Sequence, residues 1–264
     1  MRAIDIMNAL FAMAMERDYS HSCDTCKAGD PEVEVTHVAV TMFPTPDVIR
    51  RAKEWGAQLL IVHEPAYYNH MDTHSEEKLE CEKRKLIEDS GLTVFRYHDH
   101  AHWTYPDVIC AGEVKYMGLP GVAEYPGSFD TVRITLDQAM TPVQIAATLE
   151  KNLGIKHIRI CGSRDALCTK VTGLFGAPGG VFEELKREES QVVLTGETSE
   201  WCLGEYARDA AQMGYKKALL ILGHEGSERA GMIYTADILR EMYPDLAVEY
   251  FNCGEVYTYT DSDR

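Results

Sequence analysis

The chain has 264 residues, of which 45% are hydrophobic and 26% charged, enough for one large domain or two small lobes with a buried core. Acidic residues outnumber basic ones by 42 to 26, which gives a formal net charge of −16. This balance excludes nucleic acid as the main partner, because phosphate recognition needs a basic face. No apolar run approaches the ~20 residues that a membrane-spanning helix requires, so we expect no membrane partner.

The first segment, residues 1–15, is apolar enough to be compared with a signal peptide. Asp5 and Asn8 interrupt the run, however, and its apolar residues recur at helical spacing. We therefore predict an amphipathic helix and a cytoplasmic protein whose eight cysteines are mostly reduced. Cys23 and Cys26 form a single C-x-x-C, which could bind metal with a partner pair or act in redox chemistry. Because no second pair exists in the sequence, we interpret them as reduced loop cysteines.

Helical and strand patterns alternate along the first half of the chain. Thr45 and Pro46 suit the N-cap and the first turn of a helix that Gly56 ends. The pattern predicts a helix over 1–15, a strand over 35–42, a helix over 45–56, a strand over 58–62, a helix over 75–90, a strand over 92–97 and a helix over 105–117.

A Pro- and Gly-rich segment over 119–128 predicts a lobe boundary, and the alternation then resumes. We expect lobes over 1–124 and 125–264, with the last helix and strand able to dock on the first lobe. Strands separated by helices indicate crossover connections, and hence an α/β protein with largely parallel or mixed sheets. The elements predicted here are strands over 131–136, 155–160, 170–175, 192–195, 217–222 and 247–251, and helices over 141–153, 181–188, 200–213 and 227–242.

Metal-ligating residue types follow three of the predicted strands. His63 and Glu64 follow one strand, a cluster that begins at His98 follows another, and His224 follows a third. Ligand sites in open α/β sheets gather outside the carboxyl ends of strands, and imidazole and carboxylate are ligands for Zn, Mn and Fe. Glu228 lies one helical turn after His224 and would face the same point. From spacing alone, a metal site and a set of ordinary surface histidines are equally good interpretations.

Five short motifs occur in order along nearly the whole chain. Together they resemble the Trp-Asp-Asn…Gly segment, the strand ending in His-His-Pro, the Ala-His-Thr-Asn-Leu-Asp segment, the Thr-Gly-Glu and the Gly-His…Glu of the Nif-three-like family (Ngg-one-interacting factor three). In this sequence the motifs are Ser22 to Asp30, Leu59 to Pro65, Tyr97 to His102, Leu194 to Glu197, and Gly223 to Glu228.

The resemblance implies two similar α/β lobes with mixed sheets, a dinuclear metal cleft between them and a toroidal homohexamer. It implies two divalent metal ions per chain (Zn, Fe or Mn). The ligands that carry over are His63, Glu64, His102, His224 and Glu228. Two positions depart from the family, because Glu64 replaces a His and His102 replaces an Asp. The total of three histidines and two carboxylates is unchanged, and the identity of the metal is left open. His100 or Asp99 is the alternative to His102 if the register differs.

The leading hypothesis is a metal-dependent hydrolase of a small-molecule substrate. Glu197 or His98 would carry the proton, although Glu197 could equally orient a ligand or cap a helix. The rival is a non-catalytic metal-storage, metal-delivery or scaffold ring. GTP cyclohydrolase-type activity is a further alternative that rests on the family's usual description alone.

Overall fold

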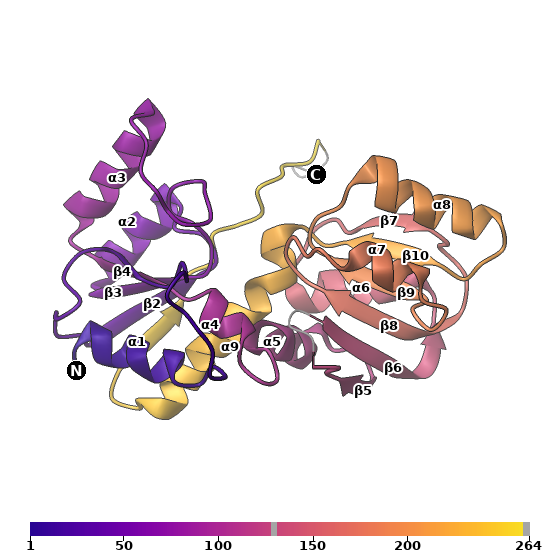
Figure 1. Cartoon of the computed structure of the whole chain (residues 1–264), viewed down its shortest axis with the longest axis horizontal. Helices are drawn as coiled ribbons and strands as arrows, with labels where there is room; N and C mark the ends of the chain where they lie inside the picture. Colours follow the sequence, from indigo (N-terminus) through magenta and orange to yellow (C-terminus); the bar gives the residue numbers. More distant parts are fainter. Residues whose placement is uncertain (128–130, 261–264) are drawn as a thin grey trace. The chain divides into compact units, whose positions relative to one another are not determined.

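The computed structural model describes residues 1–127 and 131–260 (Figure 1). The chain folds into two compact units. The first unit comprises residues 1–108 and 231–253, and the second comprises 109–230 together with the chain from 254 onward. Helix α9 (His224–Met242) contributes its first seven residues to the second unit and the rest to the first. Within the described residues, every helix is too short or too polar to cross a lipid bilayer.

The first unit is built on a five-stranded mixed sheet. Its strand order is β1-β4-β3-β2-β11, and the last four strands are parallel while β1 runs antiparallel to β4. The strands are β1 (Cys26–Ala28), β2 (His37–Thr41), β3 (Leu59–Val62), β4 (Thr93–Arg96) and β11 (Ala247–Tyr250). The helices that belong wholly to this unit are α1 (Ala3–Phe11), α2 (Pro46–Trp55), α3 (Lys78–Ser90) and α4 (Asp99–His102).

Apolar side chains of two helices cover one face of this sheet. Val48 and Ile49 of α2 and Ile87 of α3 share a buried cluster with Leu60 and Val62 of β3. Helix α1 lies on the opposite side of the sheet (Figure 1). Coverage on both faces explains why β3 is buried along its whole length and reads as a continuous apolar run in the sequence.

The second unit contains a six-stranded mixed sheet. Its order is β5-β6-β8-β9-β10-β7, in which β8, β9 and β10 are parallel and the other pairs antiparallel. The strands are β5 (Gly121–Glu124), β6 (Thr131–Met140), β7 (Arg159–Gly162), β8 (Cys168–Leu174), β9 (Val192–Thr195) and β10 (Ala218–Ile221). The helical segments are α5 (Val108–Met117), α6 (Pro142–Leu153), α7 (Val181–Lys186), the π-helical η1 (Glu200–Gly204) and α8 (Glu205–Gln212).

Alternate residues of the central strands supply two separate cores in this unit. Leu194 of β9 packs in a cluster with Leu149 of α6, whereas the adjacent Val193 packs in a cluster with Leu185 of α7 and Ala207. This is the two-residue period of a strand that is buried on both faces. The α/β class and the mixed sheets predicted from the sequence are therefore confirmed.

Most predicted elements are confirmed, some with shifted ends, and the short helix α4 was not predicted. Thr45 caps α2 by accepting a hydrogen bond from the Val48 N–H, as the sequence predicts. The strand predicted over 155–160 is wrong in position, because β7 begins only at residue 159. The sequence did not predict the edge strands β1 and β5. Strand β5 lies in the segment 119–128 that was predicted to be a lobe boundary. Residue 128 of that segment lies outside the described part of the chain. Helix α9 begins at His224, three residues earlier than predicted, which places His224 in the first turn.

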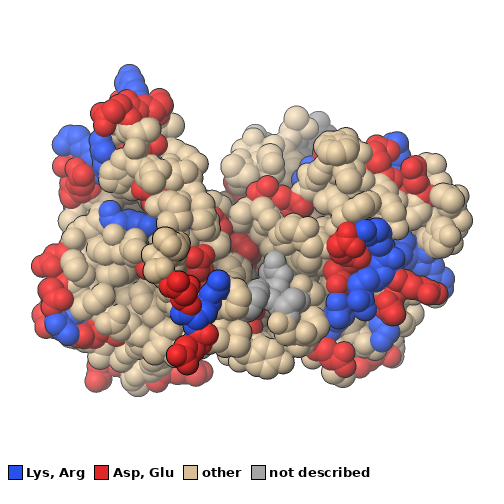
Figure 2. Space-filling model, viewed as in Figure 1, with Lys and Arg blue, Asp and Glu red and all other residues tan. Residues whose placement is uncertain are grey.

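Acidic and basic side chains are interspersed on the face of the protein shown in Figure 2. Many of the ion pairs join side chains one helical turn apart, such as Arg51 with Asp47 and Lys85 with Asp89. Exposed pairs of this kind contribute little to stability. Arg51 and Lys85 therefore lie on solvated helix faces beside acidic side chains.

Candidate metal centre

Three imidazoles gather at one edge of the first unit's sheet. His63 directly follows β3 and His98 lies just beyond β4, and these strands are parallel neighbours with Val62 opposite Arg96. The ring centroid of His63 is 4.7 Å from that of His98 and 5.1 Å from that of His102, and the last two centroids are 4.9 Å apart. One ligand atom of each residue lies within 4.8 Å of the others. This cluster can hold a metal ion.

An oxygen acceptor fixes the orientation of two of these rings. His63 Nδ1 lies 2.9 Å from the Tyr97 carbonyl oxygen, and His102 Nδ1 lies 2.9 Å from Asp107 Oδ2. A carbonyl oxygen only accepts, so His63 carries its proton on Nδ1 and keeps a lone pair on Nε2. The same holds for His102 beside the Asp107 carboxylate. This hydrogen bonding from the outer nitrogen is the arrangement that orients histidine ligands in metal sites.

His98 is oriented in the same way by its neighbour in sequence. Its Nδ1 lies 2.8 Å from Asp99 Oδ1. Burial alone would raise the pKa of Asp99, but hydrogen bonds from His98 and Ser22 outweigh it and hold that pKa well below its usual range. Asp99 is therefore a carboxylate that accepts from His98, and Nε2 of His98 faces Glu64 Oε1 at 3.8 Å.

Asp24 organises the turn that carries the histidine cluster. Its carboxylate accepts hydrogen bonds of 2.7 Å from the backbone N–H groups of His98 and His100, and its Oδ2 lies 2.7 Å from His100 Nδ1. The His100 ring also stacks on Phe11 and Tyr19, at centroid distances of 4.2 and 3.8 Å. His100 thus packs in the core beside Asp24, away from the three-imidazole cluster. Spacing did not single out Asp24; its place in the segment that resembles Trp-Asp-Asn is the signal that could have found it.

Glu64 lies beside this cluster and is almost fully buried. Its Oε2 is 3.7 Å from Nη2 of Arg96, whose side chain is completely buried. The ion pair keeps a negative charge next to His98 in a region of low dielectric constant. Glu64 could therefore supply a carboxylate ligand from the same edge of the sheet.

His224, Glu228 and Glu197 form a second group, in the other unit. His224 Nε2 lies 3.2 Å from Glu228 Oε2, across the first turn of α9. His224 Nδ1 lies 2.8 Å from Oε1 of Glu197, which follows β9. The helix after β9 has Ser199 as its N-cap, so Glu197 orients His224 and does not cap that helix. Gly176 has a φ of +69°, which favours glycine, and a Cβ there would lie 2.3 Å from Glu228 Oε1 and displace that carboxylate.

Cys23 and Cys26, the two cysteines of the C-x-x-C, have different partners. Cys26 Sγ donates to the Ala28 carbonyl oxygen at 3.2 Å, whereas Cys23 Sγ lies 3.5 Å from Asp99 Oδ1. Burial raises the pKa of both thiols, so both are protonated at neutral pH. All eight cysteines lie in the described part of the chain, and none of them forms a disulfide. Cys23 lies in a loop as predicted, whereas Cys26 is the first residue of β1.

The comparisons with known proteins agree with the resemblance seen in the motifs. The sequence model of the Duf34/NIF3 family (NGG1p interacting factor 3) matches residues 1–254, and the chain belongs to this family. A protein of Clostridium perfringens described as a GTP cyclohydrolase 1 type 2 homolog is 24% identical over 222 residues, 81% of each chain. A homolog of the same description from Clostridium acetobutylicum is 23% identical over 207 residues, 76% of this chain and 75% of its own.

Solved structures share the fold. The crystal structure of a Bacillus cereus protein related to NIF3 superposes with a TM-score of 0.78 at 14% identity, covering 98% of this chain and 99% of its own. The protein ybgI, described as of unknown function, gives a TM-score of 0.78 at 17% identity and covers 97% of this chain and 100% of its own. The family and the fold that the sequence motifs indicated are both confirmed.

Burial of His63 predicts a pH-dependent stability. Burial first, and the neighbouring His98 and His102 second, lower the pKa of His63 well below 6.5, so the folded protein keeps this ring neutral. The unfolded chain binds a proton there below about pH 6.5, so the free energy of unfolding should fall as the pH drops from 7 to 5. We expect His63→Gln to flatten this slope by up to about 1.4 kcal/mol per pH unit, measured by urea denaturation with a chelator present.

The matched control is His74→Gln, which removes an exposed imidazole. A slope that flattened equally in both variants would contradict the special role of His63.

Proposed function

We propose that this protein binds divalent metal ions and uses them to hydrolyse a small-molecule substrate in the cytoplasm. The observation that carries the proposal is the His63, His98 and His102 cluster, whose ligand atoms lie within 4.8 Å of one another. Each ring has its Nδ1 beside an oxygen acceptor, which leaves its Nε2 as the ligand atom. Imidazoles so oriented suit Zn, Fe or Mn, and we assign His63 and His102 as ligands with His98 beside them.

Family membership supports a larger ligand set with up to two ions per chain. The proposed ligands are His63, Glu64, His102, His224 and Glu228. The two carboxylates would offset part of the mutual repulsion between two dications, and the three imidazoles would complete the ligand set. In this set His98 borders the ligands, and Glu197 fixes the tautomer of His224 through its hydrogen bond to Nδ1.

A bound divalent ion would supply a more acidic water molecule and polarise a carbonyl or phosphoryl group of the substrate. The chain's own part is to hold protons and charge in place. His98 keeps its Nδ1 proton hydrogen-bonded to the Asp99 carboxylate, 2.8 Å away, and can take up or release a proton at Nε2, which makes it the first candidate for the proton carrier. A pocket beside His224 is lined by His157, Arg159 and Tyr257, which could bind an anionic group of a substrate.

A metal store, metal-delivery protein or scaffold ring is the second candidate. The observation that favours it is burial, because His63 is completely buried and Glu228 almost so, and closed sites are typical of structural metals. GTP cyclohydrolase-type activity is supported by the names of the two Clostridium relatives. Screening the metal-loaded protein against phosphoesters, nucleotides and cyclic amides separates these alternatives, since a store would turn over none of them.

The double variant His224→Ala with Glu228→Ala should lose bound metal. The wild-type protein is expected to carry up to two transition-metal ions per chain. The double variant should lose metal because it removes nitrogen and oxygen ligands that lie 3.2 Å apart. Elemental analysis of the purified proteins measures the loss. His157→Ala, in the same unit, is the control and should keep its metal. Unchanged metal in the double variant would refute this assignment.

The exchange of ligand types between Glu64 and His102 can be tested by reversing it. We expect Glu64→His and His102→Asp each to weaken Zn²⁺ binding, because each single change alters the count of carboxylates beside the metal. The double variant restores the family's pattern and its total charge, so it should bind Zn²⁺ more tightly than either single variant. Competition with a chelating dye measures the affinities. Additive losses in the double variant would show that the two residues do not serve one metal site.

We expect a homohexamer in solution, on the basis of family resemblance. Light scattering at micromolar concentration, with the chain mass of 29.7 kDa as the unit, measures the assembly directly. A monomer under these conditions would rule out the ring.

A further inference from the structure

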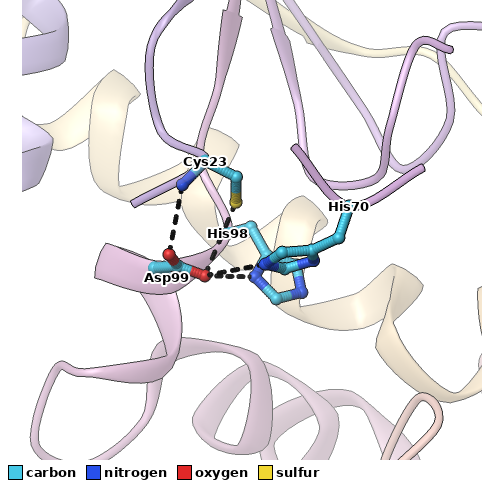
Figure 3. A group of neighbouring side chains, drawn as sticks. All are labelled: Cys23, His70, His98 and Asp99. Carbon is cyan, nitrogen blue, oxygen red and sulfur yellow. Dashed lines mark hydrogen bonds and ion pairs between the residues drawn. The ribbon is translucent and has the colours of Figure 1, made fainter. Parts of the chain in front are cut away.

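His98 also belongs to a second group of metal-ligating side chains within the first unit (Figure 3). Cys23 comes from the loop before β1, His70 from the loop after β3, and Asp99 from the start of α4. Together with His98 they offer a thiol, a carboxylate and two imidazoles, with ligand atoms within 4.8 Å of one another. Neither the family's ligand set nor the C-x-x-C pattern accounts for this group, because Cys26 Sγ bonds to the Ala28 carbonyl oxygen instead.

Asp99 Oδ1 is the common neighbour of the other three ligand atoms. It lies 2.8 Å from His98 Nδ1, 3.5 Å from Cys23 Sγ and 3.9 Å from His70 Nε2 (Figure 3). Metal bonds of about 2.0–2.3 Å in a tetrahedral site put the ligand atoms roughly 3.3–3.8 Å apart. The Cys23 distance falls within this range, the His70 distance slightly exceeds it, and the His98 distance is about half an ångström too short. Small movements of His98 and His70 would bring the atoms around Asp99 Oδ1 to the spacing of a bound ion.

We propose that Cys23, His70, Asp99 and Nδ1 of His98 form a thiolate-containing site for a divalent transition metal such as Zn²⁺. The donor set is one sulfur, one oxygen and two nitrogens, whereas the ligands proposed from the family are nitrogens and oxygens only. A thiolate selects Zn²⁺, Co²⁺ or Fe²⁺ over hard cations such as Mg²⁺. The two groups would thus differ in the metals that they prefer.

Metal binding at this site follows a defined proton balance. The Cys23 thiol loses its proton to solvent when sulfur becomes the ligand. The proton on His98 Nδ1, now hydrogen-bonded to Asp99, leaves that nitrogen and is taken up at Nε2. One proton is released per ion bound, and no oxidant or reductant is needed.

His98 connects the two groups because its nitrogens face opposite ways. Nδ1 faces Asp99 at 2.8 Å, and Nε2 faces Glu64 at 3.8 Å, toward His63 and His102. As a neutral ring it offers one lone pair, so it serves one group at a time. Filling the thiolate site therefore protonates the nitrogen that faces the three-imidazole cluster.

The geometry also gives the ion a route of entry. The Cys23 side chain is buried, with 1% of the residue exposed, whereas the His70 side chain is 57% exposed. His70 would be the outermost ligand and could bind the ion first, after which the buried thiol completes the site.

Cobalt(II) tests this site by a signature that nitrogen and oxygen ligands do not give. A thiolate ligand produces an intense sulfur-to-cobalt charge-transfer absorption in the near ultraviolet. We expect this band when Co²⁺ is added to the metal-free full-length protein. It should be absent in Cys23→Ser and retained in Cys26→Ser, which removes the other thiol of the same loop. Circular dichroism and thermal melting confirm that the variants fold.

Two further variants complete the test. His70→Ala changes an exposed side chain and should weaken Co²⁺ binding while the fold is intact, even if Cys23→Ser fails to fold. His224→Ala with Glu228→Ala should keep the band, so failure of the proposed function and failure of this site give different results. Absence of the band in the wild type, its persistence in Cys23→Ser, or unchanged Co²⁺ affinity in His70→Ala would each overturn the proposal.

Discussion

The buried guanidinium of Arg96 connects the end of β4 to the loop that follows β3. It donates to the carbonyl oxygens of His63, at 2.9 Å, and of His70, and it pairs with Asp72 Oδ2 at 3.2 Å and with Glu64. A buried charge without partners would cost several kcal/mol, so these contacts are obligatory once the side chain is enclosed. Arg96 therefore fixes the backbone that presents His63 and His70 relative to the strand that leads to His98.

Asp72 also holds the loop after β3 in place. Its carboxylate accepts from the backbone N–H groups of Ala66 and Tyr67, at 2.7 and 3.1 Å, and pairs with Lys27 at 3.2 Å. The loop after β3 is thus held by side-chain charges in place of a regular element. Removing Asp72 would leave two buried cations with one partner fewer, and the ligand-bearing loop would lose its fixed position.

The imidazoles of both units are oriented in the same way, by an oxygen acceptor at Nδ1. Tyr97, Asp107, Asp99 and Glu197 each place an oxygen 2.8 to 2.9 Å from the Nδ1 of a different histidine. Because these acceptors hold the rings in one tautomer, the Nε2 atoms are ready to act as ligands without reorganisation. Burial of His63 reinforces this by keeping the ring neutral, the form that binds metal. The orientation of these rings and the neutral state of His63 are therefore set by the fold before any ligand arrives.

The sequence by itself determined most of the elements, the class of fold and the family. Caps such as Thr45 and the apolar run of β3 act over a few residues, so their pattern is readable without the fold. Strand-end positions also placed His63 and His224 beside candidate ligands. Only the tertiary structure decided which nitrogen each histidine presents and that Cys23 meets Asp99, far away in the chain. Those contacts depend on strand register and on side-chain packing between distant segments, which no local pattern encodes.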